Sequence, residues 1–111
     1  MKKILVLLLV LIPVVSSADQ SVPHFIATTA REYGIDPQMA LYVSFKESSW
    51  NCNAVGDSSR SYGCWQIFLP AHPTVTKAQA KDLEWSTHWS MKRMVKDGSC
   101  KIWTTCPTSE T

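Results

Sequence analysis

Residues 36–67, DPQMALYVSFKESSWNCNAVGDSSRSYGCWQI, join a helical pattern to an irregular one. Asp36 and Pro37 form a helix start, because aspartate caps a helix N-terminus and proline fits the first helical position. The pattern then stays helical as far as Glu47. Residues 49–69 are rich in Ser, Asn, Gly and Asp and have no clear period, which is typical of a loop or of short irregular strands. The stretch therefore predicts a helix that ends near Glu47 and leads into a long polar loop.

Glu47 continues an apolar stripe of this helix. Ala40, Val43 and Glu47 are spaced i, i+3 and i+7, so they lie on one face. Glu47 also lies near the helix C-terminus, where the negative end of the helix dipole opposes a carboxylate. Burial and the dipole would both raise the pKa of this carboxyl, as a general acid requires. On periodicity alone, an ordinary surface glutamate at a helix end is the simpler interpretation.

Three further helices are predicted outside this stretch. Residues 22–33 carry apolar side chains at helical spacing and are followed by a glycine. Thr76 is placed to cap a short helix over residues 77–80, and Asp82 to cap the next helix, which Gly98 ends. The candidates for burial in this last helix are Leu83, Trp85, Trp89 and Met94.

Residues 1–18 have the three-part pattern of a secretory signal peptide. A basic start (residues 1–3) precedes an apolar run (4–15), and the small residues 16–18 follow it. The apolar run is short for a membrane span, which needs roughly 20 residues. We therefore expect a secreted or periplasmic protein without a stable membrane span once the signal is removed.

The mature chain would be residues 19–111, which suffices for one small domain with one core. Without Lys2 and Lys3, nine basic residues balance nine acidic ones. This balance gives no electrostatic argument for binding nucleic acid or an anionic membrane surface. All eleven aromatic residues lie in the mature part, which suits carbohydrate binding as well as a dense core.

Four cysteines in an exported chain predict disulfides. They are Cys52, Cys64, Cys100 and Cys106, and three connectivities are open. We favour Cys52–Cys64 with Cys100–Cys106, because each pair brackets a loop. A zinc site with four thiolates would use closely paired cysteines, whereas the intervals here are eleven, thirty-five and five residues. We predict neither a metal site nor a cofactor.

Several motifs follow one another around the polar loop. They are Glu47-Ser48-Ser49-Trp50, NAVGD at 53–57, SYGCWQI at 61–67 and His72-Pro73. Together they resemble the soluble lytic transglycosylase (SLT-type) family, which is related to goose-type lysozymes. In that family a Glu-Ser pair is followed by a loop and then by Gly-Leu-x-Gln-Ile. The resemblance extends from about residue 35 to residue 73, and more weakly to residue 98.

The chain departs from the family pattern at two places. Cys64 stands where the family usually has leucine, which fits a disulfide to Cys52 that pins the loop. The family's downstream Ala-Tyr-Asn-Ala-Gly motif is absent, and residues 99–106 stand in its place. The far side of the cleft is therefore the part of the site about which the resemblance says least.

The resemblance implies a mainly α, lysozyme-like small helical domain with an irregular or short β loop after the catalytic helix. Glu47 matches the family's single catalytic acid, and Ser48 would help to hold this acid or the N-acetyl group of the substrate. The predicted substrate-binding residues lie in the second half of the loop or beside the acid: Ser48, Gly63, Gln66 and Ile67. Gly63 would let the backbone approach a ligand, and Gln66 offers both a donor and an acceptor.

Three further residues are candidate accessory groups: Asp57, Trp65 and Trp103. Asp57 follows Gly56 and also fits a turn or cap. Trp65 fits either a core position or a platform for a sugar ring. The expected partner is the glycan strand of peptidoglycan, the expected state is a monomer, and nucleic acid is not expected to bind.

The activity that the resemblance implies is cleavage of the β-1,4 bond between N-acetylmuramic acid and N-acetylglucosamine, with a 1,6-anhydro product and Glu47 as acid and base. Two alternatives stay open on the sequence. One is a hydrolysing, goose-type-like lysozyme in which Asp57 assists a water. The other is a peptidoglycan-binding module without catalysis.

Overall fold

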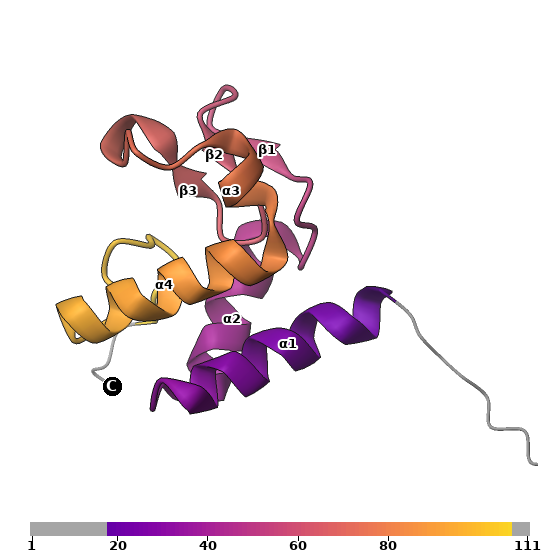
Figure 1. Cartoon of the computed structure of the whole chain (residues 1–111), viewed down its shortest axis with the longest axis vertical. Helices are drawn as coiled ribbons and strands as arrows, with labels where there is room; N and C mark the ends of the chain where they lie inside the picture. The colour runs from indigo at the N-terminus through magenta and orange to yellow at the C-terminus, as the bar shows by residue number, and fades with distance from the viewer. Residues whose placement is uncertain (1–17, 108–111) are drawn as a thin grey trace, which may run out of the picture.

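The computed structural model describes residues 18–107, which form a mainly α domain with one small sheet (Figure 1). The mainly α class with a short β loop is therefore confirmed. The elements, in chain order, are α1 (Ala18–Glu32), α2 (Pro37–Ser48), β1 (Val55–Gly56), β2 (Ser61–Tyr62), β3 (Ile67–Phe68), the single 3-10 turn η1 (Leu69–Ala71), α3 (Lys77–Lys81) and α4 (Leu83–Asp97).

The predicted caps set the ends of three helices. The Asp36 carboxylate accepts the backbone N–H of Gln38 at 2.9 Å and starts α2. Thr76 forms a capping box at the start of α3, and Asp82 caps α4. Gly98, with φ of +71°, ends α4 in the left-handed conformation that glycine adopts easily. The helices predicted at these three places are confirmed.

The N-terminal helix starts earlier than predicted. α1 begins at Ala18, four residues before the expected start at residue 22. Pro23 lies inside α1 near its N-terminus, where the missing N–H of a proline removes few helical hydrogen bonds. Apart from Ala18, the predicted signal peptide lies outside the described residues.

The segment between α2 and α3, residues 49–76, is called the β loop and contains three two-residue strands. They pair antiparallel in the order β1-β2-β3, and Tyr62 lies opposite both Val55 and Ile67. Strands this short are marginal by themselves. The Cys52–Cys64 disulfide, with Cα atoms 4.0 Å apart, supports the sheet by joining the segment before β1 to the turn between β2 and β3. This predicted pairing is confirmed, as is Cys100–Cys106.

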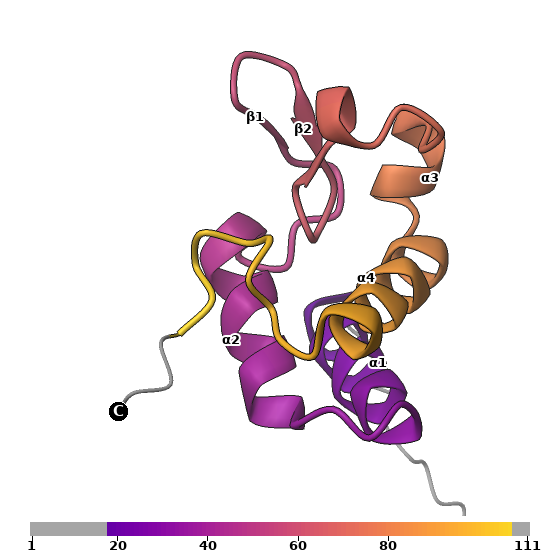
Figure 2. The same cartoon turned by 90° about the vertical axis from the view of Figure 1, so that its left-hand side faces the viewer.

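The core joins the three long helices to this loop. Ile26 of α1, Val43 of α2 and Met91 of α4 are fully buried, and so is Trp65 from the turn between β2 and β3. The Trp65 indole N–H donates to the Thr87 hydroxyl at 3.0 Å, which ties the sheet to α4. The segment after α4, residues 98–107, is called the C-terminal loop. Figure 2 shows this loop running beside α2, with the sheet beyond the C-terminal end of this helix. In the part of the chain that the structure describes, no helix has the length and apolar character needed to cross a membrane.

Candidate active site

Glu47 lies in the last turn of α2 and is half-buried. Its Oε2 accepts a hydrogen bond from the Thr105 hydroxyl at 2.7 Å. Burial raises the pKa of Glu47 above its ordinary value, and the negative charge of Asp57 adds to the rise. The Thr105 hydrogen bond opposes it by favouring the charged form. Burial has the larger effect, so Glu47 has the raised pKa of a general acid.

An open cleft of about 260 Å³ lies in front of Glu47. One side is formed by the β loop and the other by residues from the C-terminal loop. The lining residues are Glu47, Asp57, Ser61, Gln66, Phe68, Ile102, Trp103 and Thr104. Four of the site residues predicted from the sequence therefore line one cleft: Glu47, Asp57, Gln66 and Trp103.

Asp57 lines this cleft and also shapes the turn after β1. Its φ of +52° is left-handed, as expected for an aspartate in a tight turn. Its Oδ2 accepts a hydrogen bond from the Ser61 hydroxyl at 2.5 Å. The turn role predicted for Asp57 and a position facing the cleft therefore coexist in one residue.

Ser48 is not among the lining residues of the cleft. Its hydroxyl donates to the backbone carbonyl of Cys64 at 2.8 Å and lies 3.3 Å from that of Ser44. These contacts tie the end of α2 to the β loop. Ser48 thus holds the loop against the helix that carries Glu47, and its contact with substrate stays a prediction.

Gln66 lines the cleft and at the same time organises the loop. Its amide nitrogen donates to the carbonyls of Ala54 at 3.1 Å and Gly63 at 3.0 Å. Its amide oxygen faces Gly56, where an added Cβ would lie only 2.4 Å away. Gln66 also has a left-handed φ of +48°, a strained conformation that its side-chain bonds maintain. The donors of Gln66 are therefore directed to the loop.

Gly63 and Ile67 face the protein interior. Gly63 is buried, and a Cβ built on it would lie 1.8 Å from the carbonyl oxygen of Ala80 in α3. The close backbone approach predicted for Gly63 thus exists, but it is made to α3. Ile67 is 2% exposed and belongs to the core. Neither residue lines the cleft, and sugar contact by these two residues has no support from their positions.

The two candidate tryptophans differ in their access to the cleft. Trp65 has no exposed surface and occupies the core, which is one of the two alternatives left open for it. Trp103 lines the cleft although only 5% of it is exposed. Its indole N–H donates to the backbone carbonyl of Trp65 at 2.8 Å, and the two rings lie 5.7 Å apart. Trp103 therefore forms a fixed part of the cleft wall.

In the C-terminal loop the sequence singled out Trp103, but it did not reveal the other residues that this loop contributes to the cleft. Thr105, which bonds to Glu47, and the lining residues Ile102 and Thr104 all lie between Cys100 and Cys106. The disulfide bracket marked this segment as a fixed loop, but nothing in the pattern placed it beside α2. It occupies the part of the chain that departs from the family motif.

The fold and the site define a small helical domain with a half-buried, raised-pKa glutamate at an open cleft, an arrangement suited to cleaving glycosidic bonds. The family model described as the transglycosylase SLT domain matches residues 24–88. This match covers more than half of the chain, and the chain belongs to the transglycosylase SLT domain family. Membership supports a lytic-transglycosylase-like function in general and peptidoglycan as the substrate. No curated protein and no solved structure matches the chain.

Replacing Thr105 by valine is expected to move the alkaline limb of the pH–activity profile to higher pH. The Thr105 hydroxyl stabilises the charged form of Glu47, so its loss raises the pKa of Glu47 further. A general acid with a higher pKa stays protonated, and hence competent, to higher pH. We also expect roughly tenfold lower activity at the optimum, because the carboxyl loses an orienting bond.

The matched control is Thr104→Val, which alters the neighbouring threonine but leaves the Glu47 bond in place. This control should keep the alkaline limb where the wild type has it, whatever it does to KM. An unshifted limb in Thr105→Val would show that the hydrogen bond has no influence on the acid.

Proposed function

We propose that the chain is an exported peptidoglycan lytic transglycosylase that cleaves the β-1,4 bond between N-acetylmuramic acid and N-acetylglucosamine. Glu47 is the single acid and base. The observation that carries the proposal is the half-buried Glu47 at the mouth of the cleft, with its pKa raised by burial. Glu47 also lies within the matched family segment, at the Glu-Ser pair.

Glu47 acts twice in this reaction. The protonated carboxyl first gives its proton to the bridging oxygen as the bond from that oxygen to C1 of the muramoyl residue breaks. The C6 hydroxyl of the same residue attacks C1, and the Glu47 carboxylate takes the hydroxyl proton. The product is a 1,6-anhydro sugar, no water is consumed, and Glu47 ends protonated. One carboxyl suffices because the nucleophile belongs to the substrate, unlike in the two-carboxyl glycosidase scheme.

Export is part of this proposal. The predicted signal peptide directs the chain out of the cytoplasm and into the compartment that contains peptidoglycan. The two disulfides support the same compartment, because disulfides persist in oxidising surroundings. We propose that the mature chain acts there as a monomer.

Mass spectrometry of digested peptidoglycan tests the reaction type. We expect fragments that end in 1,6-anhydro-N-acetylmuramic acid, because the C6 hydroxyl replaces water as the nucleophile. Reducing-end muramic acid, heavier by one water, would contradict the transglycosylase proposal and support a hydrolase.

A hydrolysing lysozyme is the second candidate, because Asp57 shares the cleft with Glu47 and influences its pKa. In such an enzyme Asp57 would act as a base on the attacking water. The variant Asp57→Asn separates the two candidates. A transglycosylase should retain most of its activity and its anhydro product, whereas a hydrolase that depends on Asp57 should lose about 10²-fold or more.

A further inference from the structure

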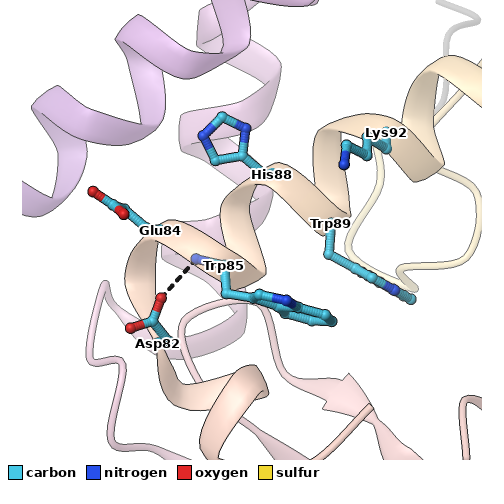
Figure 3. Close-up of a pocket in the computed structure, with 6 residues that line it drawn as sticks. All are labelled: Asp82, Glu84, Trp85, His88, Trp89 and Lys92. Atoms are coloured by element: carbon cyan, nitrogen blue, oxygen red, sulfur yellow. Dashed lines mark hydrogen bonds between the residues drawn. The ribbon is translucent and has the colours of Figure 1, made fainter. Parts of the chain in front are cut away.

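A second hollow lies along α4, apart from the cleft at Glu47 (Figure 3). Its volume is about 370 Å³, against about 260 Å³ for the cleft. Trp85 and Trp89 line it from positions one helical turn apart, and Figure 3 shows both indoles projecting from the same side of α4. The remaining lining residues are Asp82, Glu84, His88 and Lys92.

The sequence predicts Trp85 and Trp89 to be buried, but both are only half-buried. The prediction was wrong in this respect because each indole covers the core with one part and borders the open hollow with another. The Trp89 ring is held in place by His72, whose ring meets it edge-on with centroids 4.9 Å apart. Two large aromatic side chains beside an open hollow, one of them held by a ring contact, form a surface suited to a ligand.

The chemistry of the walls indicates what this ligand is. Indole rings stack on the flat faces of sugar rings, while the carboxylates of Asp82 and Glu84 accept hydrogen bonds from hydroxyl groups and Lys92 donates them. A wholly apolar ligand would strip water from these charged groups without replacing their hydrogen bonds. Acidic residues at the start of α4 are also favoured by the helix dipole, so Asp82 and Glu84 are not by themselves evidence for a peptide ligand.

The hollow and the cleft are joined by a pair of tryptophans. The ring of Trp89 meets that of Trp103 edge-on, with centroids 6.4 Å apart. Trp89 lines the hollow on α4, and Trp103 lines the cleft at Glu47. The α4 hollow and the cleft therefore adjoin each other through the contact between these two rings.

We propose that the α4 hollow is a distal subsite for sugar rings of the glycan strand that is cleaved at Glu47, with Trp85 and Trp89 as the stacking residues. The inference rests on the proposed function for the identity of the strand. Trp85 lies within the segment that matches the family, whereas Trp89 and Lys92 lie beyond it. The subsite gives the enzyme a preference for long strands over short ones.

Binding of soluble N-acetylglucosamine oligomers to the full chain tests the subsite, with Glu47→Gln as the background to prevent turnover. We expect Trp85→Ala to weaken binding of the hexamer about tenfold and binding of the trimer less. The matched control is Trp50→Ala, which removes another half-buried tryptophan that lines neither hollow. The indole N–H resonance of Trp85 should also shift on adding hexamer, a readout that needs no variant at this position.

Equal losses for trimer and hexamer, or a hexamer that leaves both the affinity and the Trp85 resonance unchanged, would overturn the inference. So would a Trp85 dependence seen only with fragments that carry a stem peptide, since the ligand would then be the peptide. Digestion of peptidoglycan by the wild-type chain is scored separately. If the wild type digests peptidoglycan but Trp85→Ala does not change the affinity for the hexamer, only the subsite is refuted. If Trp85→Ala weakens hexamer binding but the wild type does not digest peptidoglycan, only the proposed function is refuted.

Discussion

Replacing Glu47 by glutamine is expected to lower the rate of peptidoglycan cleavage by about 10³-fold or more. Glutamine keeps the size of the side chain and accepts the Thr105 hydrogen bond, but it has no proton to give to the bridging oxygen. It also lacks the basicity to take the proton of the attacking hydroxyl. Both halves of the proposed reaction fail together, and the measurement is the release of soluble fragments from purified peptidoglycan.

The fold of this variant should survive. A carboxyl whose pKa is raised on folding contributes stability at low pH, and this contribution is lost as pH rises through its folded-state pKa. At neutral pH a neutral glutamine in the same place is therefore expected to leave the unfolding midpoint equal to or above that of the wild type. Glu32→Gln is the matched control, since Glu32 is also the last glutamate of a helix but is exposed. Undiminished cleavage by Glu47→Gln would show that another residue is the acid, and a wild type without cleavage would favour a binding module.

Local rules were enough to predict much of this domain. Asp36, Thr76, Asp82 and Gly98 mark helix ends through groups within three or four residues of themselves, so the sequence reveals them directly. The raised pKa of Glu47 was predicted for a similar reason, because the apolar stripe that Glu47 continues belongs to its own helix and marks the face to be buried.

The parts that the sequence missed depend on contacts between distant segments. Thr105 reaches Glu47 across 58 positions of the chain, and Trp89 meets Trp103 only because the C-terminal loop folds back beside α4. No periodicity encodes such contacts. The same holds for the half-exposure of Trp85, since the position of the neighbouring segments decides how much of a helix face they cover.

Gly63 shows how a correct local inference acquires a different meaning in the fold. Because glycine has no side chain, the sequence predicted that the backbone at Gly63 closely approaches another group, and the resemblance implied that this group is a ligand. The structure gives Ala80 of α3 instead, at a distance that leaves no room for a Cβ. The same turn supplies the carbonyl that Gln66 holds, so Gly63 connects the packing of α3 to the cleft.

Replacing Gly63 by alanine is accordingly expected to destabilise the domain by about 4 kcal/mol or more, as in other cases where backbone strain and overpacking combine. The added Cβ would lie 1.8 Å from the Ala80 oxygen and 2.7 Å from its carbonyl carbon, and φ of +89° is itself unfavourable for alanine. Gly34→Ala separates the two causes, because Gly34 has φ of +72° and nothing within 4 Å of an added Cβ. That control should cost only about 1–2 kcal/mol, the price of the left-handed conformation. Denaturant unfolding measures both, and equal losses would mean that α3 moves away from Gly63 without resistance. A larger loss of stability for Gly63→Ala than for Gly34→Ala, together with slower peptidoglycan cleavage, would show that the contact of Gly63 with Ala80 of α3 maintains the shape of the cleft.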